Sequence, residues 1–252
     1  MMKQQVTKQR VRMGLLIGMF LLFPLIMNYF SPYIIIDGAS QGIVNGSLIV
    51  FGLMFLSALF VGRLWCGWAC PMGALQEFTT AANNGRFRTG KRDWIKWFIW
   101  LPWIVIIVAA VIAAGGYHAV DPILDTTNGV SVAYSADNPF GYTTYYLVIG
   151  IFFALALLIG RRAGCHTICW MAPFMILGRK LRNLGRWPSL RLVAEPAQCA
   201  DCKKCTTNCP MSLDVNAMVH RGSMEHNECI LCGTCVDNCS KDAIRYSFSA
   251  GR

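Results

Sequence analysis

Charged side chains are scarce in this chain. Of its 252 residues only 14% are Asp, Glu, Lys or Arg, while 55% are apolar and the mean hydropathy is +0.43. A typical soluble domain carries about 25% charged residues, so this balance argues against a single soluble domain and suits a bilayer. Four stretches approach the roughly 17 to 25 apolar residues that a transmembrane helix needs. They are residues 13–30, 43–61, 95–114 and 144–159, of which the last is the shortest.

Lysine and arginine are absent from two segments between these stretches, residues 31–42 and 115–143. All 23 basic residues lie elsewhere, and the two segments instead hold four acidic residues, Asp37, Asp121, Asp125 and Asp137. Because basic residues accumulate on the cytoplasmic side, the pattern predicts four spans with both termini in the cytoplasm. No small-residue cleavage site follows the first stretch, so we expect a retained helix and not a signal peptide. The expected location is the cytoplasmic membrane, crossed several times.

Motifs for several other functions are also missing. No nucleic-acid-binding motif accompanies the net charge of +10, which attraction to the lipid bilayer explains, so no nucleic-acid partner is expected. Only four histidines occur, none in the middle of an expected span, and there is no C-x-x-C-H, which disfavours haem. The 12 methionines form no repeated Met-x-x-Met run, so they are better explained as core filling than as copper ligands.

Cysteine, by contrast, is abundant, and eight of the 12 residues form two runs near the C-terminal end. Both runs have the spacing C-x2-C-x2-C-x3-C of bacterial two-cluster ferredoxins, in which the fourth cysteine of each run reaches the other cluster. The predicted ligands are Cys199, Cys202, Cys205 and Cys239 for one [4Fe–4S] cluster, and Cys229, Cys232, Cys235 and Cys209 for the second. Structural zinc would use only two C-x2-C pairs, and disulfides are disfavoured in a reducing compartment. Pro210 follows the first run, whereas Ser240 follows the second.

Composition divides the chain into three parts. Residues 1–169 are the expected transmembrane domain, an all-α four-helix bundle. Residues 170–192 interleave Arg and Lys with Leu, Ile and Trp, which is typical of an interfacial linker. Residues 193–252 are the expected two-cluster ferredoxin domain of the bacterial α+β type, whose small core needs the support of bound clusters. Within it, Ser212 is expected to cap a short helix that ends near Gly222.

The other four cysteines form two C-x3-C pairs, Cys66 with Cys70 and Cys165 with Cys169. Each pair follows a Gly-Arg at the cytoplasmic end of an expected span, which indicates a repeated unit of two helices. Related by pseudo-symmetry, the pairs would supply four thiolates to a third, membrane-edge centre, and an iron–sulfur cluster is favoured there over zinc or copper. The alternative is that they are small buried side chains without a ligand. His166 stays open as a ligand, a proton carrier or an interfacial side chain.

Three parts of the sequence together resemble a known family. The motif WCGWACPMGA, the paired CHTICWMAPFM and the terminal two-cluster ferredoxin are similar to those of NapH/NosR-type membrane polyferredoxins, over nearly the whole chain. The resemblance implies electron transfer between the quinol pool or a flavin and a partner redox protein, and related members assist metalloenzyme assembly. Two departures stand out. Cys169 is followed by Trp-Met-Ala-Pro and not directly by Pro, and the chain lacks room for the flavin domain of the NosR branch, so no covalent flavin is expected.

The predicted function is that of an integral membrane iron–sulfur protein passing electrons between the membrane quinone pool, or a membrane partner, and cytoplasmic redox partners. Quinol dehydrogenase activity is left open and no catalytic residue is assigned. The alternatives are an accessory protein supplying electrons for maturation of a metalloenzyme or cofactor, and a simple membrane-tethered ferredoxin. No motif fixes a quinone site. The candidates are His118 with Asp121 on the outer side, and Trp65, Trp68 and His166 on the inner side.

Overall fold

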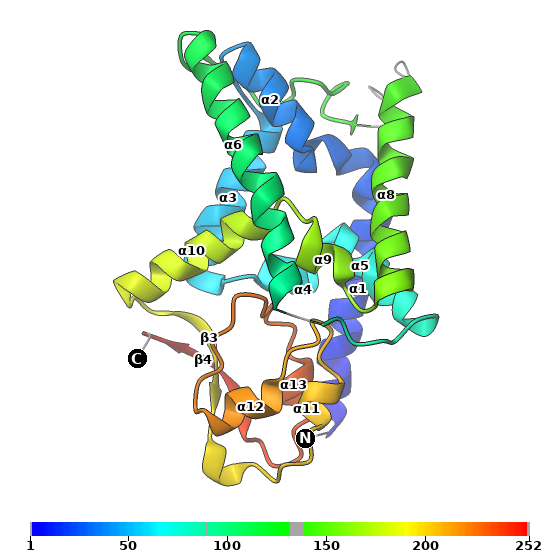
Figure 1. Ribbon diagram of the computed structural model, residues 1–252, viewed down its shortest axis with the longest axis vertical. Helices are drawn as coiled ribbons and strands as arrows, with labels where there is room; N and C mark the ends of the chain where they lie inside the picture. Colours follow the sequence, from blue (N-terminus) through cyan, green and yellow to red (C-terminus); the bar gives the residue numbers. More distant parts are fainter. Residues whose placement is uncertain (1, 89, 132–138, 251–252) are drawn as a thin grey trace.

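The computed structural model describes residues 2–88, 90–131 and 139–250, and most of these are helical. Long helices occupy the upper part of Figure 1, a layer of short helices lies below them, and the C-terminal segments form a separate lobe at the bottom. The N-terminus lies beside this lobe and the C-terminus lies on its other flank, so both ends of the chain are at the lobe end of the molecule.

Four long helices correspond to the four predicted stretches. They are α1 (Met2–Ile26), α3 (Gly46–Val61), α6 (Ile95–Ala113) and α8 (Pro139–Ile159). Among the described residues, two helical segments are long and apolar enough to cross a bilayer, Lys8–Ser40 and Arg92–Ala113. The first of these continues from α1 through the 3-10 helix η1 (Met27–Phe30) into α2 (Pro32–Ser40). The apolar helices Gly46–Val61 and Thr143–Ile159 are shorter.

The two segments that lack basic residues meet at the end of the long helices remote from the lobe (Figure 1). Strand β1 (Ile43–Asn45) pairs in parallel with β2 (Ala119–Asp121). The Asn45 side chain then caps α3 by accepting the Leu48 amide at 3.0 Å. This pairing is why α3 begins at Gly46 and not at the start of the predicted stretch. Asp137, counted among the acidic residues of these segments, lies outside the described residues.

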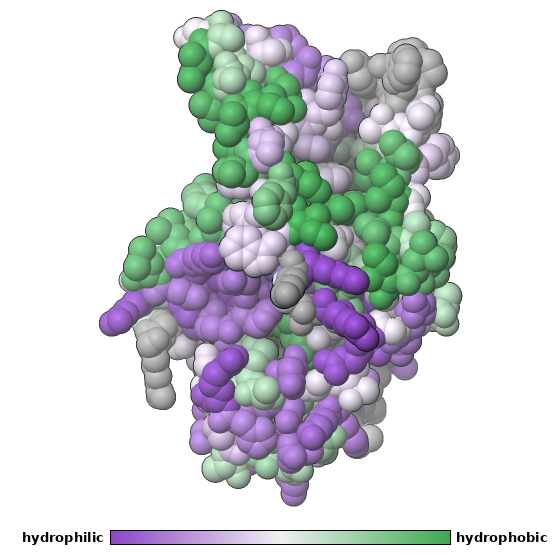
Figure 2. Space-filling model, viewed as in Figure 1, coloured by the Kyte–Doolittle hydropathy of each residue, from purple (hydrophilic) through white to green (hydrophobic). Residues whose placement is uncertain are grey.

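The long helices expose apolar side chains on their outer faces. Leu21, Ile112 and Leu158 are 71%, 73% and 82% exposed. Figure 2 shows hydrophobic residues over much of the upper part and mostly hydrophilic residues over the lobe. An apolar surface of this extent is unfavourable in water and marks contact with lipid or another apolar partner.

The lobe is a small α+β unit built around one two-stranded sheet. Strand β3 (Ser189–Ala194) pairs antiparallel with β4 (Ile244–Ser249), so the start and end of the tail are joined. Between the strands lie the 3-10 helix η4 (Pro196–Gln198) and the helices α11 (Lys204–Thr207), α12 (Val215–His220) and α13 (Thr234–Asp237). Strand β3 begins inside the segment predicted to be a linker, since all six of its residues pair with β4.

The prediction that Ser212 caps the short helix of the tail is wrong. The N-cap is Asp214, whose carboxylate accepts the Ala217 amide at 3.1 Å. Ser212 instead adopts a positive φ of 55°, and its hydroxyl accepts the amide of Phe87 at 3.0 Å. Its role is therefore to hold the loop before α6 against the tail. The chain does turn at Gly222, where φ is +69°.

A layer of short helices joins the long helices to the lobe. It comprises α4 (Leu64–Trp68), α5 (Pro71–Phe78), η2 (Thr79–Ala81), η3 (Lys91–Trp94), α9 (Ala163–Thr167) and α10 (Ala172–Gly185). Helix α10 packs along α3 and lies within the predicted interfacial segment. Two of its arginines, Arg179 and Arg182, are buried and pair with Glu225 of the tail at 2.6 and 3.2 Å. The segment therefore docks the lobe onto the long helices.

Candidate metal centres

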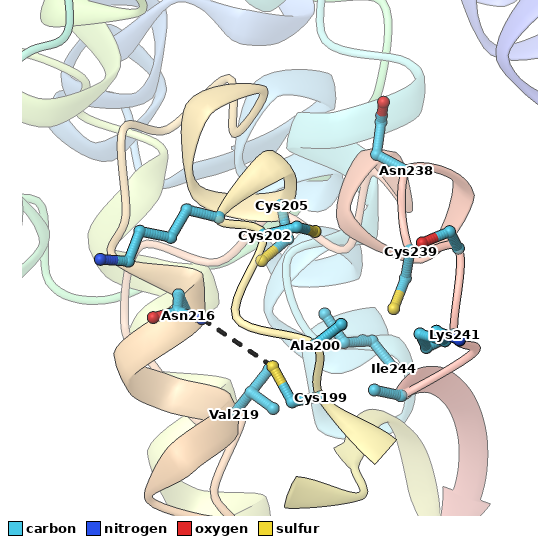
Figure 3. Close-up of a pocket in the computed structure, with 13 residues that line it drawn as sticks. Cys199, Ala200, Cys202, Cys205, Asn216, Val219, Asn238, Cys239, Lys241 and Ile244 are labelled. Carbon is cyan, nitrogen blue, oxygen red and sulfur yellow. Dashed lines mark hydrogen bonds between the residues drawn. The ribbon is translucent and has the colours of Figure 1, made fainter.

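One set of tail cysteines surrounds a cavity at the surface of the lobe. The lining includes Cys199, Cys202, Cys205 and Cys239. In Figure 3, Cys239 approaches from the segment after α13, opposite the three cysteines that precede or begin α11. Cys202 is exposed and Cys205 is buried, so the cavity is open to solvent on one side. The Asn216 amide donates to Cys199 Sγ at 3.9 Å.

The second set of tail cysteines surrounds a more buried cavity. The lining includes Cys209, Cys229, Cys232 and Cys235, and all four are buried. Most of the remaining lining is apolar. Burial raises the pKa of Cys209 to about 12 and raises that of Cys235 well above its ordinary value, and the neighbouring cysteines add to both shifts. Such thiols ionise readily only beside a compensating positive centre.

The chain folds in the same way before each fourth cysteine. Helices α11 and α13 are each a single turn, preceded by a residue of positive φ, Lys203 at 58° and Gly233 at 80°. The Asn208 amide donates to Asn238 Oδ1 at 3.3 Å, which ties the two copies together just before the fourth cysteines. The duplication carries Cys209 and Cys239 each to the cavity of the other run.

The donor sets suit a polynuclear group better than a single ion. Among the residues that the structure describes, no three His, Cys, Asp or Glu side chains are grouped so that they could hold one metal ion. A zinc ion needs its thiolate ligands at about 2.3 Å from one centre. Four thiols spread around a cavity instead fit a [4Fe–4S] cluster, in which each iron takes one cysteine.

The two C-x3-C pairs, Cys66 with Cys70 and Cys165 with Cys169, occupy matching turns. In each pair the carbonyl of the residue before the first cysteine, Trp65 or Gly164, accepts the amide of the second cysteine, at 3.0 and 3.1 Å. The first cysteine of each pair lies in a five-residue helix, α4 or α9, and each pair is followed by a helix with proline in its first turn. The different residues after Cys169 therefore leave the local fold unchanged.

These four cysteines form one buried site. Each is 4 to 5% exposed, and they lie close enough to act on one another electrostatically. Burial and then the neighbouring cysteines raise the pKa of Cys169 to about 12 and raise that of Cys70 as well. Gln76 of α5, the helix that follows Cys70, links the two pairs. Its side chain donates to Cys165 Sγ at 3.1 Å and accepts the Gly164 amide at 2.8 Å. We refer to Cys66, Cys70, Cys165 and Cys169 as the four-thiol site.

Buried cations outnumber buried carboxylates around the four-thiol site. The ion pairs are Glu77 with Arg12 and Arg162, and Glu228 with Arg63 (2.8 Å) and Lys96 (2.5 Å). All four cations are at most 3% exposed. Burial opposes ionisation of the carboxylates, but the cations outweigh it and lower the pKa of Glu77 and of Glu228, the latter to about 2. Within the described residues, this network therefore has two positive charges in excess.

The two arginines of this network nearest the thiols hold equivalent places in the repeat. Arg63 and Arg162 each lie three residues before the first cysteine of a pair. Arg162 also donates to the Cys66 carbonyl at 2.8 Å, so it contacts the opposite pair. Burial raises the pKa of Cys165, and the charges of the two arginines act against that rise. Both arginines therefore favour the thiolate form.

His166 lies between the four-thiol site and the second tail cavity. Its ring is completely buried, with Nδ1 2.7 Å from Asp93 Oδ1 and Nε2 3.2 Å from the Met211 carbonyl. Met211 lines the second tail cavity, whereas His166 is adjacent to Cys165 in the chain. Complete burial is inconsistent with an interfacial side chain. Because both ring nitrogens already face oxygen acceptors, the contacts favour a proton carrier over a metal ligand.

The loop of the second tail cavity packs directly on the four-thiol site. Trp68 donates its indole N–H to the Leu231 carbonyl at 3.1 Å. Gly67 lies so close to the Ile230 carbonyl that a Cβ there would collide with it. Two quinone candidates are thereby placed. The indole N–H of Trp68 is already used by its hydrogen bond to the tail. His118 is exposed next to β2, at the end of the long helices remote from the lobe.

Two family patterns match separate parts of the chain. Residues 45–91, which include Cys66 and Cys70, match a 4Fe-4S binding domain. Residues 198–244, which include all eight tail cysteines, match a 4Fe-4S dicluster domain.

Relatives extend the likeness over most of the chain. The nitrogen fixation protein FixG of Rhizobium meliloti is 29% identical over 78% of this chain and 41% of its own length. The methylamine utilization ferredoxin-type protein MauN of Paracoccus denitrificans is 26% identical over 83% of this chain and 70% of its own. An uncharacterized protein of Methanocaldococcus jannaschii is 24% identical over 88% and 77%. These matches confirm the resemblance of the chain to the NapH/NosR-type polyferredoxins. No solved structure matches it.

The polyferredoxin is therefore an iron–sulfur electron-transfer protein, and its dicluster domain binds two [4Fe–4S] clusters. Sequence reasoning missed the buried ion pairs and Gln76. Two signals could have revealed them. Arg63 and Arg162 recur at one spacing before the cysteines, and Lys96 interrupts an apolar stretch, where a charge usually has a partner and a function.

Proposed function

We propose that this polyferredoxin is an integral membrane electron carrier with four spans and both termini in the cytoplasm. It passes electrons between the membrane quinone pool, or a membrane partner, and cytoplasmic redox partners. The exposed apolar faces of the long helices support the spanning arrangement. So does the pairing of β1, which directly follows segment 31–42, with β2 of segment 115–143 at the end remote from the lobe.

The tail cavities support the assignment of its clusters. One cluster would be held by Cys199, Cys202, Cys205 and Cys239, and the other by Cys209, Cys229, Cys232 and Cys235. When bound, such clusters supply one-electron transfer at potentials set by their surroundings. The chain buries the second set and leaves the first beside solvent, so a soluble partner would approach the first.

The observation that carries the membrane role is the excess of two buried positive charges at the four-thiol site. Four thiolates around a [4Fe–4S] core carry a net double negative charge, which matches this excess. An unpaired buried charge costs several kcal/mol, so neutral thiols alone would leave the network unbalanced. A third centre at Cys66, Cys70, Cys165 and Cys169 restores the balance.

The contacts between the sites give the carrier an order. The four-thiol site would exchange electrons with the bilayer side. Gly67, Trp68 and His166 bring it against the second tail cavity. These residues exclude water from the contact and hold the two sites in place. The cavity lined by Cys199, Cys202, Cys205 and Cys239 would be the last site in the order of electron transfer, since its Cys202 is exposed.

The two alternative functions also use electron transfer through iron–sulfur clusters, but they differ in the molecule that receives the electrons. The names of FixG and MauN refer to nitrogen fixation and methylamine utilization, so an accessory electron supply for metalloenzyme or cofactor maturation remains the second proposal. A simple tethered ferredoxin, the third, would have no use for the buried charge excess.

The test removes one cysteine from each pair. Cys66→Ala and Cys165→Ala should each eliminate the same metal centre, seen as a loss of about four irons per protein with the tail clusters spectroscopically intact. Reduction of the tail clusters by a quinol analogue should slow sharply in both. Cys239→Ala, the matched control, should instead disturb a tail cluster. Unchanged iron in both membrane-edge variants, with only the roughly 1 to 3 kcal/mol loss of a packing mutant, would reduce the chain to a tethered ferredoxin.

A further inference from the structure

A pocket of about 410 Å³ lies at the junction of the long helices and the lobe. Its walls come from three places: the start of α6 with the preceding η3, helix α10, and the tail loop of residues 226–228. This volume is within the range of pockets that hold small molecules, roughly 300 to 1,000 Å³. Neither the predicted cluster ligands nor the earlier quinone candidates line it.

Two polar side chains of this pocket have hydrogen-bonding capacity left for a ligand. His226 Nδ1 accepts the Glu228 amide at 3.1 Å, so the neutral ring carries its proton on Nε2. No hydrogen bond of the described residues uses that Nε2–H. Asp93, whose side chain is 17% exposed, accepts from Gly90 and contacts His166, and each of its oxygens can accept a further hydrogen bond. A donor and an acceptor therefore line the same pocket.

The other walls are aromatic and aliphatic. Trp94 and Trp97 line one side, and Ile176 and Leu177 of α10 line another. Lys180 Nζ lies over the Trp97 ring, 5.7 Å from its centroid. Among the lining residues that the structure describes, Lys180 is the one Lys or Arg, against the carboxylates of Asp93 and Glu228. This charge pattern disfavours an anion such as a phosphate headgroup and suits a flat neutral ring.

The position of the pocket connects the apolar layer to the redox sites. Trp97 belongs to α6, one of the two described helices long enough to cross a bilayer. Asp93 contacts His166, which is the residue after Cys165. Glu228 precedes Cys229 and belongs to the buried ion-pair network. A molecule in this pocket would therefore lie near both the four-thiol site, through Asp93 and His166, and the second tail cavity, through Glu228.

We propose that this pocket binds the headgroup of a lipid quinone. One carbonyl oxygen accepts from His226 Nε2–H, and in the quinol form a hydroxyl donates to Asp93. Trp94 and Trp97 flank the ring, and the isoprenoid chain leaves along α6 into the bilayer. The proposal rests on the proposed membrane electron-carrier function and names where its lipid-soluble partner sits.

The experiment uses the purified full chain with its iron and a photoactivatable azido-decylquinone. Saturable labelling is expected on peptides that contain residues 90–97, 176–180 or 226–228, and unlabelled decylquinone should compete for it. His226→Phe removes the donor and Trp97→Ala removes a wall, and each should weaken binding about tenfold, the effect of a lost hydrogen bond or ring contact. His226→Gln keeps an N–H donor and should retain most of the affinity. His118→Phe, the matched control at the other end of the helices, should bind as the unmodified chain does.

Labelling near His118, or competition by phosphatidylglycerol and not by decylquinone, would overturn the proposal, as would unchanged affinity in both His226→Phe and Trp97→Ala. Iron and sulfide content of the same samples checks folding and tests the centres separately. Full iron without saturable labelling refutes the quinone pocket and leaves the electron-carrier function standing. Loss of the membrane-edge iron with intact labelling would refute the third centre alone.

Discussion

Arg162 shows how much of the structure depends on single buried charges. It is completely buried and has a left-handed backbone conformation, with φ of 49°, which is unfavourable for a non-glycine residue. Its guanidinium pairs with Glu77 and donates to the Cys66 carbonyl. The free energy gained from these contacts must exceed the cost of the left-handed backbone conformation. Its partner in the repeat, Arg63, has the same place before Cys66.

Arg162→Gln should lower the midpoint potential of the proposed membrane-edge centre. Reduction adds negative charge, and a unit charge at about 8 Å contributes roughly 2 kcal/mol at an effective dielectric constant near 20, or somewhat under 100 mV. Redox titration followed by electron paramagnetic resonance measures the shift. The control is Arg161→Gln, which removes the adjacent, more exposed arginine that bonds to Asn84 and Thr207. An equal potential in both variants would contradict a specific role of Arg162.

The ionisation of Glu77 decides at which pH the redox titration should be carried out. Its pKa is lowered, since Arg162 and Arg12 outweigh the effect of burial. A carboxyl with a lowered pKa in the folded state contributes stability that is full above its unfolded value of about 4.3 and is lost as the pH falls through the lower folded value. Measurements at pH 6 to 8 therefore see the intact ion pairs.

Among the elements, the short helices α4 and α9 are what bring the parts together. Each is a five-residue turn that ends a long helix and presents its cysteines to the same point. In α4, Gly67 also receives the tail, because its missing Cβ leaves room for the Ile230 carbonyl. Arg12 of α1 donates to the Gly67 carbonyl at 2.7 Å from the other side. Three elements distant in sequence thus meet at one glycine.

Gly67→Ala should loosen the docking of the tail without removing its clusters. The added methyl group would displace the Ile230 carbonyl, and overpacking of this kind costs about 1 to 3 kcal/mol. Faster proteolytic cleavage between α10 and β3 is the expected result, with unchanged tail absorbance. Gly52→Ala is the control, since a Cβ at Gly52 of α3 meets no atom within 4 Å. Equal cleavage rates in the two variants would refute the close approach as a docking determinant.

At the scale of the whole molecule, the charge distribution supports the proposed orientation in the membrane. The lobe, the N-terminus and the layer of short helices lie on one side, and the paired strands β1 and β2 lie on the other. Segments 31–42 and 115–143 carry no Lys or Arg, which is the pattern of the non-cytoplasmic face.

The orientation predicts which positions an impermeant thiol reagent can reach in intact cells. Asn128→Cys, an exposed position in segment 115–143, should gain labelling over the unmodified chain if that segment is on the outer side. Arg88→Cys, an exposed position on the side of the lobe, should gain it only after the membrane is permeabilised. The reverse pattern would overturn the topology, and labelling of both in intact cells would argue against four spans.

How far the sequence alone could go differs between the parts. The apolar stretches located the four long helices to within a turn or two, except that α1 begins at Met2 and extends beside the lobe. That extension carries few apolar residues, so no hydrophobic pattern indicates it. The cysteine spacing indicated the tail sites because it encodes a local geometry. Ser212 failed as a cap because Asp214, two residues on, competes for the same role and Ser212 serves a contact with Phe87.

Contacts between remote segments were beyond sequence reasoning. Nothing in the chain near Glu228 indicates that it meets Arg63 and Lys96, more than a hundred residues away. The pocket beside Trp97 and His226 is likewise made by segments that share no motif. Such sites depend on tertiary packing, and periodicity and spacing describe only local structure.

The contact between the N-terminal helix and the tail also orders events during biosynthesis. Gln9 donates to Asp237 at 2.6 Å and to the Cys232 carbonyl at 3.2 Å, so α1 is held by residues that lie 223 and 228 positions later in the chain. Because a chain emerges from the ribosome N-terminus first, α1 is synthesised before the tail segment that it contacts. Docking of the tail onto α1 therefore cannot precede synthesis of the tail, and the contact must form after the long helices have been made.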